Sequence, residues 1–218
     1  MFGFTESEMD VFRKLGTPQK IQDYLDDMPI NFEENGDTCK SPRMVIMTGS
    51  AQCMEGAMFA AAALRINGFE PLIVDMTAAS FDYDHVIAVF RHGGFWGAIS
   101  KTNHAVLRYR EPVYMNIREL VMSFFHEYID SNGGRKAMRS YSSPVNLSRF
   151  DSKNWMTSEK DVWYVPGHLL KVDHHKIVNR SQIARFRKPH VIEIKAGNIV
   201  QWENSGANQV NNISPNFG

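Results

Sequence analysis

Cysteine is scarce in this chain, with only Cys39 and Cys53 among 218 residues. Two cysteines exclude a disulfide framework and a four-cysteine metal site. An excess of charge is also lacking, because 24 lysines and arginines balance 24 aspartates and glutamates. This balance argues against a general nucleic-acid or membrane-surface binder, which usually carries excess positive charge.

Long apolar runs are absent too, since none approaches the roughly 20 residues that cross a bilayer. The first residues, MFGFTESEMD, lack the basic start and apolar core of a signal peptide. We therefore expect a cytoplasmic protein. A hydrophobic content of 43% and a charged content of 22% are typical of a globular domain. The length favours one domain with appended elements over two independent domains.

The alanine-rich segment 52–68, QCMEGAMFAAAALRING, gives the clearest helix pattern. It contains no proline, and Asn67-Gly68 is a typical helix stop. Small residues gather on one face, so we expect a buried helix that a sheet or a second helix can approach closely. Three strands follow, joined in part by the turn His92-Gly93-Gly94, at 71–76, 85–91 and 95–100. Together these segments predict an α+β fold with a helix on a small, mostly antiparallel sheet.

Weaker patterns surround this core. Thr5 followed by Glu8 predicts a capped helix over 5–15, and Pro18 predicts a second helix after Thr17. The apolar spacing predicts another helix over 116–129. Further on, the pattern predicts a strand at 162–165 and a hairpin over 191–202 that turns at Ala196-Gly197-Asn198. We expect a core over 1–140, a C-terminal accessory region with strands over 141–204, and a flexible tail over 205–218.

Cys53 lies at the start of the predicted 52–68 helix. Unpaired backbone N–H groups and the helix dipole favour a thiolate there and also stabilise a developing oxyanion. The alternative is a small hydrophobe packed beside alanines, which is common for cysteine. His85 opens a strand directly after the polar loop FDYD, where a general base is typically displayed. A single histidine is more often structural than catalytic, so neither residue decides the question alone.

The order of these features resembles the transglutaminase-like superfamily of papain-type thiol enzymes. The matching segments are QCMEGAMFAAAALRINGFEPLIVDM, DHVIAVF and FWGAISKT, and the resemblance covers roughly residues 17–102. The later stretches AISKTNHAVLRYREPVY and RELVMSFFHEYID resemble an uncharacterised bacterial branch of that superfamily. The resemblance implies a papain/transglutaminase-like core, with Cys53 as nucleophile and His85 as base.

The third catalytic member departs from the family pattern. The family has tryptophan, three residues and then aspartate-proline-threonine, whereas here Trp96 precedes Ser100-Lys101-Thr102. Serine can accept a hydrogen bond from the Nδ1–H of the imidazole but supplies no negative charge. Three explanations are open. Ser100 or Asn103 is a neutral orienting group, Asp82 or Asp84 replaces the acid, or the site is catalytically silent.

Several neighbours are candidates for substrate binding. Gln52 precedes the nucleophile as a further oxyanion donor, and Trp96, Lys101 and His104 accompany the histidine strand and its successor. Arg108 and Arg110 either meet an anionic substrate group or pair with Glu111 or Glu119. Cys39 is interpreted as structural. His168, His174 and His175 lack the spacing of a metal site, so no metal or cofactor is expected.

The sequence therefore predicts thiol-dependent acyl chemistry, either amide hydrolysis or acyl transfer, on an unknown amide or peptide substrate. No nucleic-acid or membrane partner is expected, and the oligomeric state is open. The alternative is a catalytically silent binding or scaffold module of the same fold. A weaker third possibility is a metal-dependent hydrolase that uses the histidine-rich C-terminal segment.

Overall fold

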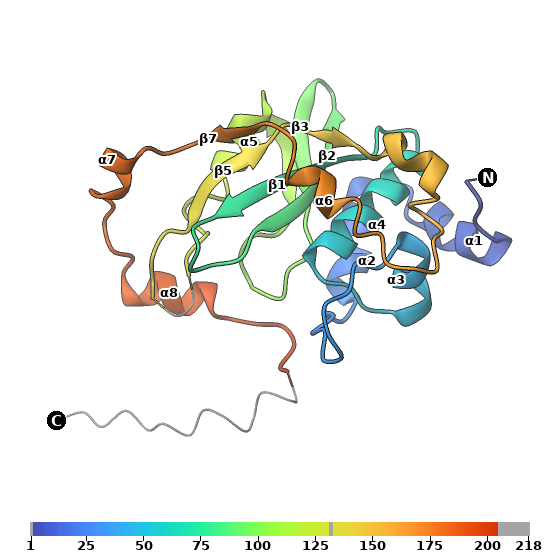
Figure 1. Cartoon of the computed structure of the whole chain (residues 1–218), viewed down its shortest axis with the longest axis horizontal. Helices are drawn as coiled ribbons and strands as arrows, with labels where there is room; N and C mark the ends of the chain where they lie inside the picture. The colour runs from blue at the N-terminus through green and yellow to red at the C-terminus, as the bar shows by residue number, and fades with distance from the viewer. Residues whose placement is uncertain (1, 131–132, 205–218) are drawn as a thin grey trace.

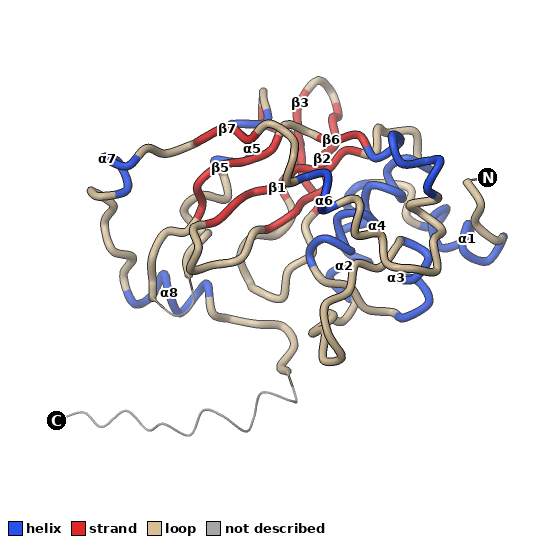
Figure 2. The backbone as a smooth tube through the Cα atoms, in the orientation of Figure 1, coloured by secondary structure: helices blue, strands red, loops and turns tan. Residues whose placement is uncertain are grey.

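The computed structural model describes residues 2–130 and 133–204, so the predicted tail over 205–218 lies outside the described residues. The chain forms a mixed α/β fold around an open antiparallel sheet of seven strands (Figures 1 and 2). The strand order is β4-β3-β2-β1-β5-β7, and β6 pairs with β1. The strands are β1 (Leu72–Ala78), β2 (His85–His92), β3 (Phe95–Ile99), β4 (Arg110–Tyr114), β5 (Met138–Ser142), β6 (Val145–Asn146) and β7 (His174–Lys176).

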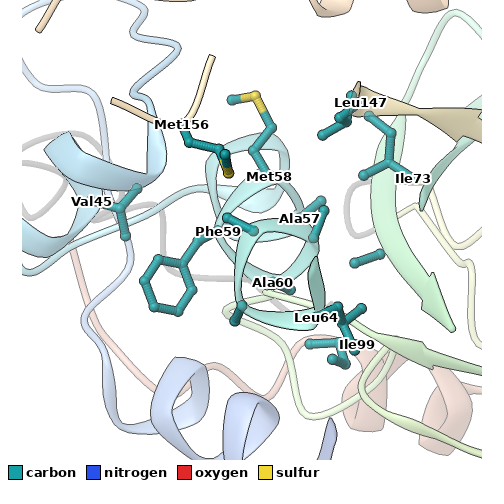
Figure 3. Close-up of a cluster of buried hydrophobic side chains, with 14 of the residues drawn as sticks. Val45, Ala57, Met58, Phe59, Ala60, Leu64, Ile73, Ile99, Leu147 and Met156 are labelled. Carbon is teal, nitrogen blue, oxygen red and sulfur yellow. The ribbon is translucent and has the colours of Figure 1, made fainter. Parts of the chain in front are cut away.

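One face of the sheet is covered by α4 (Cys53–Ile66), which packs on β2 and β1. The helices α1 (Glu6–Lys14), α2 (Pro18–Asp27) and α3 (Pro42–Thr48) surround it. Figure 3 shows α4 side chains such as Met58, Phe59 and Leu64 inside this cluster, which also contains Ile73 of β1. All residues of α4 from Met54 to Leu64 are buried, as the alanine-rich pattern predicts.

Gly56 explains how closely this helix approaches the chain after β3. A Cβ atom at position 56 would lie 2.3 Å from the Cβ of Lys101, far inside the contact distance. The prediction of a close approach along the small-residue face is therefore confirmed.

The opposite face carries a second apolar cluster. Strand residues alternate between the two clusters because successive side chains point to opposite faces. Ile73 and Ala88 face α4, whereas Val74 and Ile87 face the other side. There they meet Leu120 and Val121 of α5 (Ile117–Met122), together with Phe124. The central strands are therefore buried on both faces, which explains their nearly continuous apolar sequence.

Most sequence predictions for the first hundred residues are confirmed. Thr5 and Glu8 form the capping box of α1, and Thr17 caps α2 with Pro18 in its first turn. The three predicted strands are β1, β2 and β3. Gly93 and Gly94 both have positive φ angles, 60° and 91°, as a tight hairpin turn requires.

Several predictions beyond residue 115 are wrong. The predicted helix over 116–129 ends at Met122, and turns continue to Glu127. Residues 162–165 form turns that lead into α6 (Pro166–Leu169) rather than a strand. The predicted hairpin over 191–202 is the helix α8 (Val191–Gly197), whose start is capped by His190 and Glu193 in a reciprocal capping box. The local cap outweighs the alternating pattern because α8 is largely exposed, and Val200, beyond the helix, forms an isolated bridge with His104.

The first part of the segment 141–204 packs with the residues before it. It supplies β6 and β7 to the sheet, and η1 (Leu147–Lys153) lies between these two strands along the chain. α7 (Arg180–Ile183) and α8 follow β7 and have no buried residue. Leu147, Phe150 and Trp155 join the α4 cluster. Within residues 2–130 and 133–204, no helix is long and apolar enough to cross a membrane.

Candidate active site

Cys53 is the first residue of α4, and its neighbours fix the helix start. Gln52 is the N-cap, and its Oε1 accepts the N–H of Met54 at 2.7 Å. In return, Glu55 Oε2 accepts the Gln52 N–H at 2.9 Å. The Cys53 N–H lies in the first turn of the helix. Backbone N–H groups there have no acceptor within the helix, so this N–H can donate to a ligand. Cys53 as a whole residue is half-buried, and its sulfur is desolvated.

Glu55 holds the preceding loop to this helix start. Its carboxylate is fully buried and accepts hydrogen bonds from the Thr38 hydroxyl, the Lys40 N–H and the Asn31 amide. The Lys40 ammonium lies 3.7 Å away. The backbone around Cys53 is therefore positioned by several bonds from outside its own helix.

His85 opens β2 and is buried. Its Nε2 lies 2.8 Å from the Ser100 Oγ, directly after the end of the neighbouring strand β3. The Ser100 hydroxyl donates to the Leu107 carbonyl at 2.5 Å. Since that proton is directed to Leu107, the Ser100 oxygen accepts from an Nε2–H. This pairing leaves Nδ1 unprotonated, as a general base requires.

Gln22 of α2 fixes Ser100 in turn. Its Oε1 accepts the Ser100 N–H at 2.9 Å, and its Nε2 donates to the Ser100 carbonyl at 2.9 Å. Because both backbone groups of Ser100 are bound, the hydroxyl between His85 and Leu107 has little freedom. The ring nitrogen in this contact is Nε2, which corrects the predicted bond from Nδ1.

Cys53 and His85 line the same cavity, which has a volume of about 260 Å³. Backbone hydrogen bonds from Met54 and from Val86, the residue after His85, stabilise the Cys53 sulfur. The sulfur therefore lies at the point where the start of α4 meets the start of β2. Other lining residues come from the loops after β1 and β3 and from the turns after α5, among them Asp82, Asp84, Thr102, Asn103, Glu127 and Tyr128.

Burial keeps both members of the pair neutral near pH 7. It raises the pKa of the Cys53 thiol to about 11, against the opposing backbone bonds from Val86 and Met54. It also lowers the pKa of His85 to about 4, with a smaller contribution from His104. The Met54 N–H at the helix start does lower the pKa of the thiol, as expected, but desolvation of the sulfur outweighs it, so the net pKa lies above the usual value and a thiolate is not favoured.

Ser100 is the orienting group that contacts His85. The Asn103 amide instead forms two 2.9 Å bonds with the backbone of Trp202. Asp84 accepts the Ala78 N–H, and Asp82 accepts the Tyr83 N–H. All three residues line the cavity, but the hydrogen bonds that they form do not involve His85.

The four predicted substrate-binding residues lie in different environments. Gln52 acts as the helix cap. Trp96 lines a separate hollow with Phe90 and Arg91, which corrects its placement at the Cys53 cavity. Lys101 lines the cavity but is 1% exposed, and its ammonium binds the Leu25 and Met28 carbonyls. His104 also lines the cavity, with its Nδ1 2.8 Å from the Gly197 carbonyl.

The arginines after β3 form ion pairs, but not with the predicted partners. Arg108 binds Asp26 at 2.9 Å, and Arg110 binds Glu127 at 2.6 Å. The predicted pairing with Glu111 or Glu119 misses these carboxylates because they lie on α2 and in the turns after α5. Glu127 faces the cavity with Arg110 already bound to it.

The remaining candidates lie away from the cavity. Cys39 is fully buried, and burial raises its pKa to about 12. His174 binds Asp75 at 3.3 Å, and His175 approaches the Ser143 hydroxyl. In the described part of the chain, no group of three or more His, Cys, Asp or Glu side chains is placed to hold a metal ion.

A search of protein-family models finds no match for this chain, and no curated protein matches it. The transglutaminase-like resemblance therefore rests on the residues that carry it.

Proposed function

We propose that Cys53, His85 and Ser100 perform thiol-dependent acyl chemistry on an amide, by hydrolysis or by acyl transfer, on a papain/transglutaminase-like core. One observation carries the proposal. Cys53 and His85 line a common cavity, and the Ser100 hydroxyl holds the His85 ring in the tautomer that leaves Nδ1 free. The family resemblance rests on the same order along the chain: Cys53 at a helix start, His85 at a strand start and Ser100 at a strand end.

The chemistry begins from a neutral thiol and a neutral imidazole. His85 Nδ1 accepts the thiol proton while the sulfur forms a bond to the carbonyl carbon, and the carbonyl π electrons move to the oxygen. The Cys53 N–H at the helix start stabilises this oxyanion. When the intermediate collapses, the C–N bond breaks and the amine takes the proton from His85. Water or an amine then attacks the thioester carbonyl while His85 takes its proton. When this second intermediate collapses, the C–S bond breaks, the Cys53 sulfur takes the proton back from His85, and the acid or the new amide is released.

Ser100 explains how the ring is oriented without a carboxylate. It fixes the tautomer, but it offers no charge to stabilise an imidazolium. We therefore expect a slower enzyme than one with an acidic third member, since loss of that charge in comparable triads costs orders of magnitude in rate.

The test is a burst assay with p-nitrophenyl acetate as acyl donor, followed by intact-mass measurement. We expect one equivalent of p-nitrophenolate and one acetyl group on Cys53. Cys53→Ala should abolish the burst, and His85→Ala should slow it roughly 10²-fold or more, in the range expected for loss of a general base. Cys39→Ala is the matched control and should leave the burst rate unchanged, because Cys39 is buried away from the cavity.

A silent binding or scaffold module is the second candidate. The observation that favours it is the burial of both groups, which raises the pKa of the thiol to about 11 and lowers the pKa of the imidazole to about 4, so that the two form no ion pair. If the wild type gives no burst between pH 6 and 9, or if acetylation occurs equally in His85→Ala, the enzymatic proposal fails. The silent module would then be the better account of the fold.

A further inference from the structure

A second cavity lies at the far end of the sheet, beyond β5. Its volume is about 420 Å³, which falls within the range of small-molecule sites. The turn at 133–136, Arg139 of β5 and the segment after α7 line it, and it shares no lining residue with the Cys53 cavity. Figure 1 places α7 and α8 beyond the β5–β7 end of the sheet.

The charge of this cavity is strongly one-sided. Its lining contains five cations and no acidic residue, namely Arg135, Lys136, Arg139, Arg187 and Lys188. Arg135 pairs with Asp130, and Arg187 pairs with Glu193. Counting these two carboxylates leaves a formal charge of 5 − 2 = +3. Among the described residues, no carboxylate lies within ion-pair distance of Lys136, Arg139 or Lys188, although Glu193 acts electrostatically on Lys136.

Two of these unpaired cations are buried or partly buried. Lys136 is 9% exposed, and its ammonium has a carbonyl contact of 3.5 Å with His126. One terminal nitrogen of Arg139 donates to the Lys136 and Met138 carbonyls. Burial lowers the pKa of both residues. Positive charge in a partly desolvated site is unfavourable unless an anion compensates it.

Aromatic rings lie beside the cations. The guanidinium of Arg135 lies over the Phe81 ring at 3.7 Å from the ring centre, and the guanidinium of Arg139 lies 5.8 Å from the same point. Phe186 packs edge-on against Phe125 and also lines the cavity. Such a surface accommodates a flat ring next to an anionic group.

We propose that this second cavity binds a small molecule in which a phosphate group is joined to a flat ring, as in a nucleoside monophosphate. The phosphate binds Lys136, Arg139 and Lys188. Three cations without carboxylate partners compensate the charge of a phosphate dianion better than that of a ligand with one carboxylate group. Phe81 and Phe186 meet the ring.

The test is calorimetric titration of the full chain at low salt with AMP, inorganic phosphate, adenosine and benzoate. We expect AMP to bind at one site with a Kd below about 1 mM, and each of the other probes to bind at least tenfold more weakly. Lys188→Gln, which changes an exposed residue, should weaken AMP about fivefold to tenfold, as expected for one charge-assisted contact. Phe186→Ala should weaken AMP more than it weakens phosphate.

Matched controls separate this site from general charge effects and from the Cys53 cavity. Lys171→Gln removes another exposed lysine and should leave the AMP affinity unchanged, and so should Cys53→Ala. Thermal unfolding of each variant checks the fold. The proposed site would be ruled out if AMP binding did not saturate, or if Lys171→Gln and Lys188→Gln lost the same factor in AMP affinity. Benzoate or phosphate binding as tightly as AMP would overturn the assigned ligand class.

Discussion

At the residue scale, the Ser100 environment is built for a hydroxyl. The oxygen accepts from His85, and the proton goes to the Leu107 carbonyl. An aspartate at this position would place a carboxylate oxygen next to the Leu107 carbonyl oxygen. The carboxylate has no proton to donate to that carbonyl, so the two oxygens would repel each other. We therefore expect Ser100→Asp to slow acetylation of Cys53 rather than to restore a faster triad. Burst rates of wild type and variant decide this, and a faster Ser100→Asp enzyme would contradict it.

Ser100→Ala tests the same contact by deletion. The buried Nε2–H of His85 and the Leu107 carbonyl both lose a partner, so the free energy of unfolding should fall by about 1–3 kcal/mol. The acetylation rate should fall by at least about tenfold because the His85 tautomer is no longer fixed. Asn103→Ala is the control, since its amide binds Trp202, and its burst rate should stay within twofold of the wild type.

Lys101 has a structural role, although it lines the cavity. Its ammonium satisfies the Leu25 and Met28 carbonyls near the end of α2, and burial lowers its pKa to about 8. Lys101→Met keeps the stem but leaves two buried acceptors without a donor. Urea unfolding at pH 7 should show a loss of about 3 kcal/mol. Lys171→Met, on an exposed lysine, should change stability little, and an equally stable Lys101→Met protein would rule out this role.

At the element scale, the start of α4 depends on Glu55. A glutamine there turns one acceptor into an NH₂ group that faces the donors Thr38, Lys40 and Asn31. We expect Glu55→Gln to lose about 3 kcal/mol of unfolding free energy, as when one partner of a buried network is removed. Hydrogen exchange should rise at the Lys40 and Gln52 amides, which both donate to the Glu55 carboxylate. Glu111→Gln changes an exposed residue and is the control. If the same amides exchange at the same rate in Glu111→Gln and Glu55→Gln, Glu55 does not hold the loop to the start of α4.

The elements differ in how well the sequence predicts them. The helix at α4 and the strands β1 to β3 are predictable because pattern, cap and burial agree there. The α8 segment misleads, since its apolar residues suggest alternation while the His190 and Glu193 cap selects a helix. The site follows the same division. Cys53, His85 and Ser100 have local signals, whereas Gln22 and the Leu107 carbonyl reach Ser100 only through tertiary contacts that no spacing reveals.

At the scale of the whole molecule, burial on both faces of the sheet gives stability an unusual dependence on pH. His85 has its pKa lowered to about 4 from 6.5 by burial and by His104. The unfolded chain therefore binds this proton more tightly, and stability is lost as pH falls from 6.5 through 4. A shift of this size corresponds to about 3 kcal/mol. Asp75 acts in the opposite direction, because burial raises its pKa to about 6 from 3.8.

Protonation of Asp75 in the folded state adds stability as pH falls from 6 through 3.8, so the two slopes partly cancel in the wild type. Removing either group should reveal the pH dependence of stability that the other group causes. Relative to wild type, His85→Gln should gain stability as pH falls from 6.5 to 4.5, and Asp75→Asn should lose stability more steeply. Urea midpoints measured at half-unit steps of pH give both slopes. If the two variants follow the wild-type slope, neither group is buried in the ionisation state described for it, and the neutral pair proposed for acyl transfer loses its basis.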